Sequence, residues 1–175
     1  IIPIIYNTNG YETIETIRLL EGTIDIYLPD LKYFFDSTST KYSLCENYFS
    51  FASEAILGMT AQVGFPEFDK NGMLIKGVLI RHMLFPGMFE ESKKILKWIK
   101  KNIGEKVFIS LMSQYTPMYK AKNFHELNRK IEEVEYENLI DYFFEIGLEN
   151  GFVQENDSSD ECYVPDFDLS GIWYF

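Results

Sequence analysis

Four short apolar runs along the chain each end in a cluster of polar residues. The runs have the length of β-strands and occupy residues 1–6, 24–28, 78–85 and 107–112. The polar clusters at or just beyond their ends are residues 7–10, residues 30–32, Arg81 with His82, and Gln114 with Tyr115. Parallel α/β folds carry their chemistry on the loops at the carboxyl ends of the strands. If the runs are parallel strands, we therefore expect these clusters to converge on one rim.

Segments with helical periodicity separate the runs. Apolar residues recur every three or four positions in residues 11–21, 41–63, 90–103 and 135–150. Residues 64–72 are expected to form a loop at the tip of a small hairpin, residues 113–123 a long loop, and residues 152–154 a short edge strand. This alternation predicts right-handed βα units and an α/β fold with parallel strands. The first, third and fourth runs are almost wholly apolar, which is typical of strands covered on both faces.

The composition narrows the class of protein. The 175 residues, 46% of them hydrophobic, can bury the core of one domain, so residues 1–175 are expected to form a single domain. The net charge of −11 argues against a nucleic-acid partner. No apolar stretch approaches the roughly 20 residues of a membrane span. Cys45 and Cys162 match no metal-binding spacing, so we expect free thiols in a reducing, cytoplasmic setting and no metal site.

The second and third runs carry the charged residues of the predicted rim. Asp30 and Lys32 are two positions apart, so their side chains project on the same side of an extended chain. They form either a salt bridge between neighbours or a site in which Lys32 binds a carboxylate or phosphate of a ligand. Arg81 interrupts an apolar run, and a buried unpaired charge is too costly to persist. Its guanidinium is therefore expected to meet an anion, either a protein carboxylate such as Asp30 or a bound ligand.

The remaining polar residues of the rim offer hydrogen bonds and no protein nucleophile. Strand alternation places His82 on the opposite face from Arg81, where a hydrogen-bonded core histidine is the commoner case. Gln114 and Tyr115 are neither strong acids nor strong bases at neutral pH. The chain has no Ser–His–Asp arrangement, no Gly-x-Gly-x-x-Gly motif and no P-loop. From its residues alone, the rim is predicted to bind an anionic small molecule, and no catalytic residue is assigned.

Six segments, taken in order, resemble radical S-adenosylmethionine (SAM) proteins of the pyruvate formate-lyase activating enzyme type. The resemblance is closest to an uncharacterised iron–sulfur subgroup related to those activases. The segments read YNTNGY at residues 6–11, IYLPDLKY at 26–33, MTAQVG at 59–64, LIRHMLFPG at 79–87, LMSQYTP at 111–117 and YVPDFD at 163–168. The resemblance implies a partial (β/α)6 barrel, to which this chain supplies the third to sixth strands in about four βα units.

The resemblance also implies a cofactor chemistry. In that family a [4Fe–4S] cluster, held by the three thiolates of a CxxxCxxC motif, chelates SAM, and reductive cleavage gives a 5′-deoxyadenosyl radical. By motif, Asp30 and Lys32 match residues that contact the methionyl moiety of SAM, and Arg81 matches an active-site arginine. By the same resemblance, the turn that contains Asn7 and Asn9 would lie beside SAM. The implied cofactor-binding residues are Asn7, Asn9, Asp30, Lys32, Arg81, Gln114 and Tyr115.

The sequence departs from the family pattern at several places. Asn7 stands where activases have Asp, and Tyr115 stands where they often have a His that contacts SAM. This chain contains neither CxxxCxxC nor the Gly-Gly-Glu segment that binds the SAM amino group. We therefore expect the C-terminal portion of a radical SAM enzyme, without its cluster-binding portion, inactive alone and with neither cofactor bound to it.

Two further expectations concern partners. The alternative to an enzyme fragment is a stand-alone α/β binding or interaction module that has lost the cluster-binding half. The substrate, a protein or a small molecule, is not specified by these motifs. A partial barrel leaves the first strand, residues 1–6, with an unpaired apolar edge, and such edges invite pairing. We therefore predict self-association of the chain through that edge.

Overall fold

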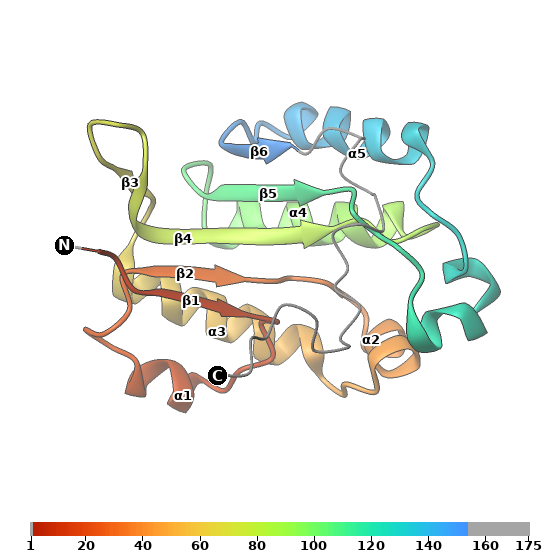
Figure 1. The fold of residues 1–175 in the computed structure, drawn as a ribbon, viewed down its shortest axis with the longest axis horizontal. Coiled ribbons are helices and arrows are strands. Elements are labelled where there is room, and N and C mark those ends of the chain that lie inside the picture. The colour runs from red at the N-terminus through yellow and green to blue at the C-terminus, as the bar shows by residue number, and fades with distance from the viewer. Residues whose placement is uncertain (1, 154–175) are drawn as a thin grey trace, which may run out of the picture.

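A six-stranded sheet forms the centre of the molecule in the computed structural model, which describes residues 2–153. Its main path is β1-β2-β4-β5-β6, and neighbouring strands along this path are parallel (Figure 1). These strands are β1 (Ile5–Thr8), β2 (Ile26–Pro29), β4 (Leu74–Met83), β5 (Phe108–Met112) and β6 (Gly151–Val153). The predicted α/β fold with a parallel sheet is confirmed, and β6 is the edge strand expected near residues 152–154.

The first strand begins later than the sequence predicts. Pro3 has no N–H group to give to a strand ladder. The N–H of Ile4 donates to Oδ2 of Asp25 at 2.8 Å, outside the ladder. Regular pairing with β2 therefore starts at Ile5, and it ends at Thr8 in register with Pro29.

The third main strand is longer than predicted at its amino end. A short strand, β3 (Glu67–Phe68), pairs with it in antiparallel register, so the hairpin expected within residues 64–72 is confirmed. The turn is closed by the N–H of Asp69, which donates to the carbonyl oxygen of Met73 at 2.9 Å. This pairing extends β4 back to Leu74.

The helices follow the predicted order with one correction. They are α1 (Ile14–Leu19), α2 (Asp36–Ser43), α3 (Tyr48–Val63), α4 (Phe89–Asn102) and α5 (Glu133–Glu145), with 3-10 turns η1 (Tyr119–Asn123) and η2 (His125–Leu127) in the loop after β5. The single helical segment predicted for residues 41–63 is wrong. Leu44 and Asn47 both adopt left-handed backbone angles with φ of 55°, which ends α2 and separates it from α3. The Ser39 hydroxyl holds the break by donating to the Cys45 carbonyl oxygen at 2.7 Å.

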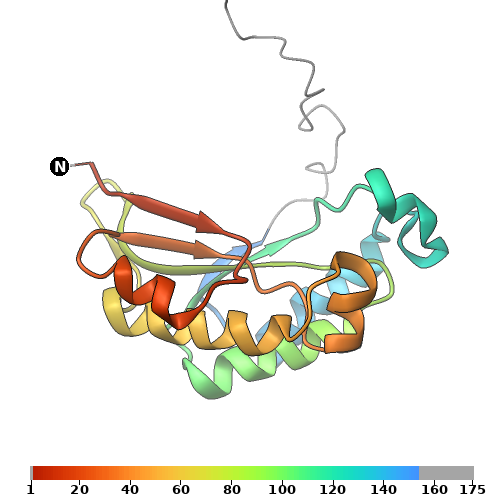
Figure 2. The same ribbon diagram turned by 90° about the horizontal axis from the view of Figure 1, so that it is seen from below.

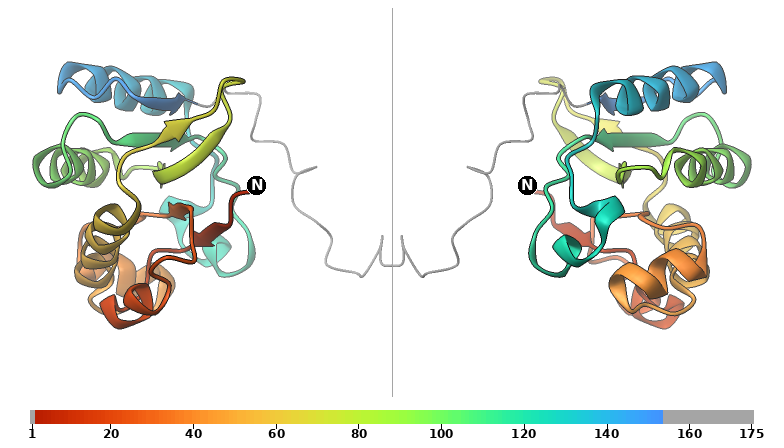
Figure 3. Two further views of the ribbon diagram at one scale, coloured as in Figure 1. Left: turned by 90° about the vertical axis from the view of Figure 1, so that its left-hand side faces the viewer. Right: turned by 90° about the vertical axis from the view of Figure 1, so that its right-hand side faces the viewer.

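All the described α-helices cover one face of the sheet (Figures 2 and 3). The parallel strands follow one another across the sheet in chain order, from β1 to β6, with β3 off this path. Right-handed crossovers that progress in one direction place every helix on the same side. Within residues 2–153 no helix covers the opposite face, which we call the open face. Ile5 is 53% exposed, and Leu79 and Phe108 are partly exposed, so the expectation that the first, third and fourth runs are covered on both faces is wrong for the described residues.

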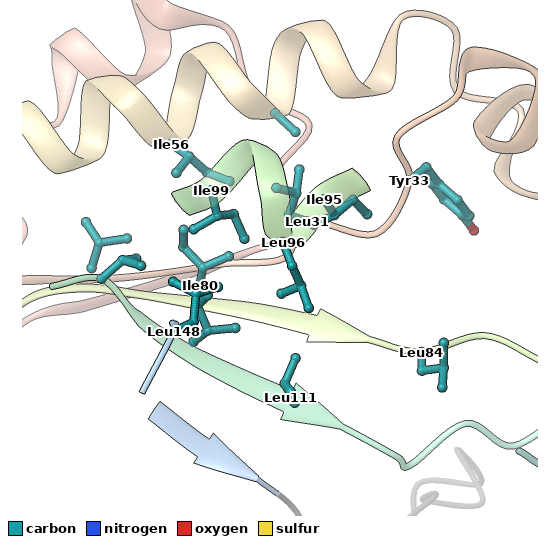
Figure 4. Close-up of a cluster of buried hydrophobic side chains, with 14 of the residues drawn as sticks. Leu31, Tyr33, Ile56, Ile80, Leu84, Ile95, Leu96, Ile99, Leu111 and Leu148 are labelled. Atoms are coloured by element: carbon teal, nitrogen blue, oxygen red, sulfur yellow. The ribbon is translucent and has the colours of Figure 1, made fainter. Parts of the chain in front are cut away.

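The core lies between the sheet and the helices. Ile80 of β4 is fully buried in a cluster with Ile99 of α4 and Ile56 of α3 (Figure 4). The alternation of β4 is clear: Val78, Ile80 and His82 are buried toward the helices, whereas Leu79, Arg81 and Met83 are partly exposed and point to the open face. Arg81 therefore reaches the side of the sheet that carries no helix.

Candidate functional site

The carboxyl ends of β1, β2 and β4 meet at one edge of the sheet, as the sequence predicts. Thr8 is in register with Pro29, and Asp30, the next residue, pairs with Arg81 in an isolated parallel bridge. The N–H of Leu31 donates to the Arg81 carbonyl oxygen at 2.9 Å. This backbone contact holds the loop after β2 against the end of β4, so the charged residues of both segments lie together.

Asp30, Lys32 and Arg81 form one ionic cluster, which we call the rim cluster. Oδ1 of Asp30 accepts a hydrogen bond from Nε of Arg81 at 2.7 Å, and Oδ2 lies 3.1 Å from Nζ of Lys32. The carboxylate side chain is 9% exposed, whereas the Lys32 and Arg81 side chains are 30% and 29% exposed. Two cations around one carboxylate give the cluster a net charge of about +1. It can attract an anion without leaving Asp30 unpaired.

The contacts within the rim cluster answer two questions that the sequence leaves open, namely which anion Arg81 meets and whether Asp30 and Lys32 form a salt bridge. The anion that Arg81 requires is the carboxylate of Asp30, and the Asp30–Lys32 pair is a salt bridge between near neighbours. Both cations nevertheless remain accessible to solvent. A ligand carboxylate or phosphate can therefore approach them from the open face, since Lys32 retains further N–H donors after it binds Asp30.

Asn7 and Asn9 lie beside the rim cluster, at the end of β1 and in the loop that follows it. Asn7 is exposed, pairs through its backbone with Leu28, and makes no side-chain hydrogen bond within residues 2–153. The side-chain oxygen of Asn9 accepts the N–H of Tyr11 at 2.9 Å, which stabilises the turn. Asn7 thus has a free amide to offer a ligand, whereas Asn9 shapes the loop.

Gln114 and Tyr115 follow β5 and make no hydrogen bond to the rim cluster among the described residues. Tyr115 is 6% exposed, and its hydroxyl donates to the Leu127 carbonyl oxygen at 2.9 Å. Its ring packs edge-on against Phe85 with centroids 5.3 Å apart. Gln114 is exposed. Tyr115 therefore holds η2 to the end of β5, and the proton of its hydroxyl is engaged in that hydrogen bond.

His82 lies on the helix-facing side of β4, as strand alternation predicts. It is 1% exposed, and Nδ1 lies 2.7 Å from the Leu31 carbonyl oxygen. Burial lowers the pKa of His82 to about 4. The ring is therefore neutral at pH 7, with its proton on Nδ1. The expectation of a satisfied core histidine is correct for Nδ1 only, because Nε2 has no hydrogen-bond partner within residues 2–153.

Two residues that shape the rim are not predicted from the sequence. Glu91, in the first turn of α4, is buried and accepts the N–H groups of Phe34 and Phe35 at 2.7 and 3.0 Å. Tyr48, the first residue of α3, is 3% exposed and directs its hydroxyl at the loops that follow β1 and β2. For Tyr48, the only signal in the sequence is that a tyrosine stands in an otherwise apolar helical stripe, because a buried tyrosine hydroxyl requires a polar partner.

The described part of the chain holds no metal-binding cluster. Among residues 2–153 no group of three or more His, Cys, Asp or Glu side chains is placed to hold a metal ion. Cys45 is a free, partly buried thiol, and Cys162 lies outside the described residues. No described helix has the length and apolar character needed to cross a membrane. A small pocket of about 170 Å³, lined by Tyr11, Glu12, Thr13 and Phe51, contains none of the rim cluster residues.

The fold defines a class: an α/β domain whose parallel strands are covered by helices on one face. A crystal structure of a domain of pyruvate-formate lyase-activating enzyme from Bacteroides vulgatus has a similar fold, with a TM-score of 0.58 and 13% sequence identity. The alignment covers 85% of this chain and 79% of that domain. The predicted fold class, part of a (β/α) barrel with parallel strands, is thereby confirmed, and at this identity the likeness concerns the fold alone.

Sequence comparison finds a longer relative. The chain is 32% identical over 143 residues to an uncharacterized protein of Methanocaldococcus jannaschii. The matched region covers 80% of this chain and 37% of that protein, so the chain spans little more than a third of the relative's length. No protein-family model matches the chain.

Proposed function

We propose that this chain is the SAM-binding, C-terminal part of a radical SAM protein of the activating-enzyme type. The rim cluster carries the proposal: a nearly buried carboxylate holds two partly exposed cations at the carboxyl ends of parallel strands. Asp30, Lys32 and Arg81 are also the residues that the family resemblance assigns to SAM. The fold likeness to a domain of an activating enzyme supports the same class.

The chemistry of the rim cluster fits the methionyl group of SAM. That group carries a carboxylate, which the Lys32 ammonium and the Arg81 guanidinium can bind with charge-assisted hydrogen bonds. Asp30 sets the positions of the two cations and offsets their mutual repulsion. In the complete protein, bound SAM would supply the carbon-centred radical chemistry that no side chain of this chain provides.

The iron–sulfur cluster does not fit this chain. The sequence contains two cysteines, and Cys45 is the one among the described residues. A cluster of this type needs thiolates gathered at one place. We therefore propose no radical step for the chain alone. The reaction is assigned to a longer protein, consistent with the greater length of the Methanocaldococcus jannaschii relative.

The test uses the complete protein that contains this chain, reconstituted anaerobically with iron and sulfide. We expect a cluster to form and SAM to be cleaved to 5′-deoxyadenosine after reduction. Lys32→Met removes one cation of the rim cluster and should raise the KM for SAM about tenfold without lowering the iron content. The matched control, Lys106→Met, changes an exposed lysine outside the rim cluster and should leave the KM unchanged.

Two outcomes would contradict the proposal. An intact cluster with the same KM for SAM in the parent and in Lys32→Met would remove the rim cluster from SAM binding. A complete protein that has no CxxxCxxC motif and leaves SAM uncleaved would instead support the alternative, a binding or interaction module without radical chemistry.

A further inference from the structure

Tyr48 lies directly beneath the candidate site. As the first residue of α3 it packs under the loops that follow β1 and β2, and its side chain is almost fully buried. Burial raises the pKa of Tyr48 above that of an exposed tyrosine, so its hydroxyl keeps its proton and remains a hydrogen-bond donor.

One hydroxyl group joins the two loops. The Tyr48 hydroxyl lies 2.9 Å from the Asn9 carbonyl oxygen and 3.0 Å from the Asp30 carbonyl oxygen, and its single proton is shared between them. The same hydroxyl oxygen accepts the N–H of Lys32 at 3.1 Å. Each of the three contacts is to the backbone of a residue in the predicted cofactor-binding set.

We propose that Tyr48 is a positioning residue of the candidate site, because its hydroxyl fixes the loop after β1 relative to the rim cluster. The ligand then meets Lys32, Arg81 and the loop that contains Asn9 already in place. A preorganised site binds more tightly than one whose loops must be ordered by the ligand. This inference rests on the proposed function only for the identity of the ligand.

The tyrosine ring is itself held in place. Tyr11 stacks on it with centroids 6.0 Å apart and an interplanar angle of 18°, and Tyr33 meets it edge-on at 5.4 Å. Aromatic contacts of this kind fix the ring orientation. The hydroxyl therefore has little freedom to leave the two loops.

Gly10 gives independent evidence that the two loops are in close contact. Its φ is +82°, and a Cβ atom at this position would lie 2.2 Å from the Asp30 carbonyl oxygen. A glycine is thus required where the first loop approaches the second. The same Cβ would come within 3.3 Å of the Tyr48 hydroxyl, so the glycine and the tyrosine support one junction.

Amide hydrogen exchange of the chain, measured by NMR, tests the positioning role directly. In Tyr48→Phe the Lys32 N–H loses its acceptor, and we expect its exchange to become about tenfold faster. The control is Tyr33→Phe, which removes a buried hydroxyl from the neighbouring ring. The Tyr33 hydroxyl lies 2.8 Å from Oγ of Ser43 and makes no hydrogen bond to residues 7–10 or 30–32, so Lys32 exchange should stay at the parental rate.

Kinetics of the complete protein provide the second measurement. Tyr48→Phe should raise the KM for SAM about fivefold while kcat stays within about twofold, since the hydroxyl touches no reacting atom. Tyr33→Phe should leave both constants unchanged. A general loss of stability would affect both variants alike, so it would not raise the KM in Tyr48→Phe alone.

The inference is overturned if Lys32 exchange in Tyr48→Phe equals that in the parent, or if the KM stays the same although Lys32→Met raises it. If Lys32→Met has no effect on the KM, the proposed ligand is wrong, and exchange alone decides the role of Tyr48. Should Tyr48→Phe not fold, Gly10→Ala opens the same junction from the other loop and must accelerate Lys32 exchange.

Discussion

At the scale of single residues, the need to satisfy buried charge is what makes the candidate site predictable. Arg81 in an apolar strand requires an anion, and the sequence already names Asp30 as one of two possibilities. The role of Tyr48 is not predictable in this way. Periodicity counts tyrosine as an apolar residue, and the partners of its hydroxyl are main-chain atoms that become neighbours only in the folded chain.

His82 makes the stability of the chain depend on pH. Its pKa is lowered to about 4 in the folded state by burial, whereas the unfolded chain has an ordinary histidine pKa near 6.5. Between these values the unfolded state binds more protons, so stability is complete above about pH 6.5 and falls as the pH drops toward 4. The shift corresponds to a loss of about 3 kcal/mol across that window.

His82→Gln tests this assignment, because glutamine does not titrate and keeps an N–H donor for the Leu31 carbonyl oxygen. We expect urea denaturation of this variant to show a much flatter dependence of unfolding free energy on pH between 6.5 and 4. His125→Gln, which changes the exposed histidine of η2, should keep the parental slope. Equal slopes in His82→Gln and the parent would assign the pH dependence to other groups.

At the scale of elements, the apolar periods predict each main strand and most helices, and the errors fall where the backbone departs from its usual angles. The break between α2 and α3 occurs at Leu44 and Asn47, both with φ of 55°. Leucine is unusual in this conformation, so no residue-type signal marks the end of α2. The polar Ser39, which caps the break through the Cys45 carbonyl oxygen, lies within the helix and resembles any solvent-facing serine in the sequence.

Leu44→Gly should therefore stabilise the chain. Leu44 is 77% exposed, so its side chain contributes little packing, and glycine adopts the left-handed conformation without the steric penalty of a Cβ atom. We expect the free energy of unfolding to rise by about 0.5–1 kcal/mol in chemical denaturation. Leu19, which is 85% exposed, is the last residue of α1, and Leu19→Gly should instead lower the free energy of unfolding by about 0.5 kcal/mol. A decrease in both variants would show that Leu44 is not strained.

At the scale of the whole molecule, the order of the strands follows from the sequence, but the open face does not. The parallel strands follow one another across the sheet in chain order, and right-handed crossovers then bring the carboxyl ends of β1, β2 and β4 together. The apolar runs were expected to be covered on both faces. In the described residues Ile5, Leu79 and Phe108 instead face the side without helices, as the inner positions of a barrel wall do. Apolar composition alone does not distinguish these two arrangements.

The edge of the sheet at β1 leads to a prediction about the whole chain. β1 ends the strand order, and Ile2, Ile4 and Ile5 are 90%, 51% and 53% exposed. An exposed apolar edge strand with unpaired N–H and C=O groups readily pairs with another copy. We expect light scattering to show concentration-dependent self-association of the chain. A double variant, Ile4→Lys with Ile5→Lys, should shift it to the monomer, because charged side chains protect edge strands.

A control variant and the complete protein together distinguish edge pairing from nonspecific hydrophobic association. Leu57→Lys changes a residue of α3 that is 41% exposed and lies on the helical side of the sheet, and it should leave the association unchanged. A monomer of the parent chain at high concentration would refute the prediction. In the proposed complete barrel a further strand pairs with β1, so the complete protein should not associate through this edge. Association of the chain together with a monomeric complete protein would therefore support the placement of β1 inside a larger barrel.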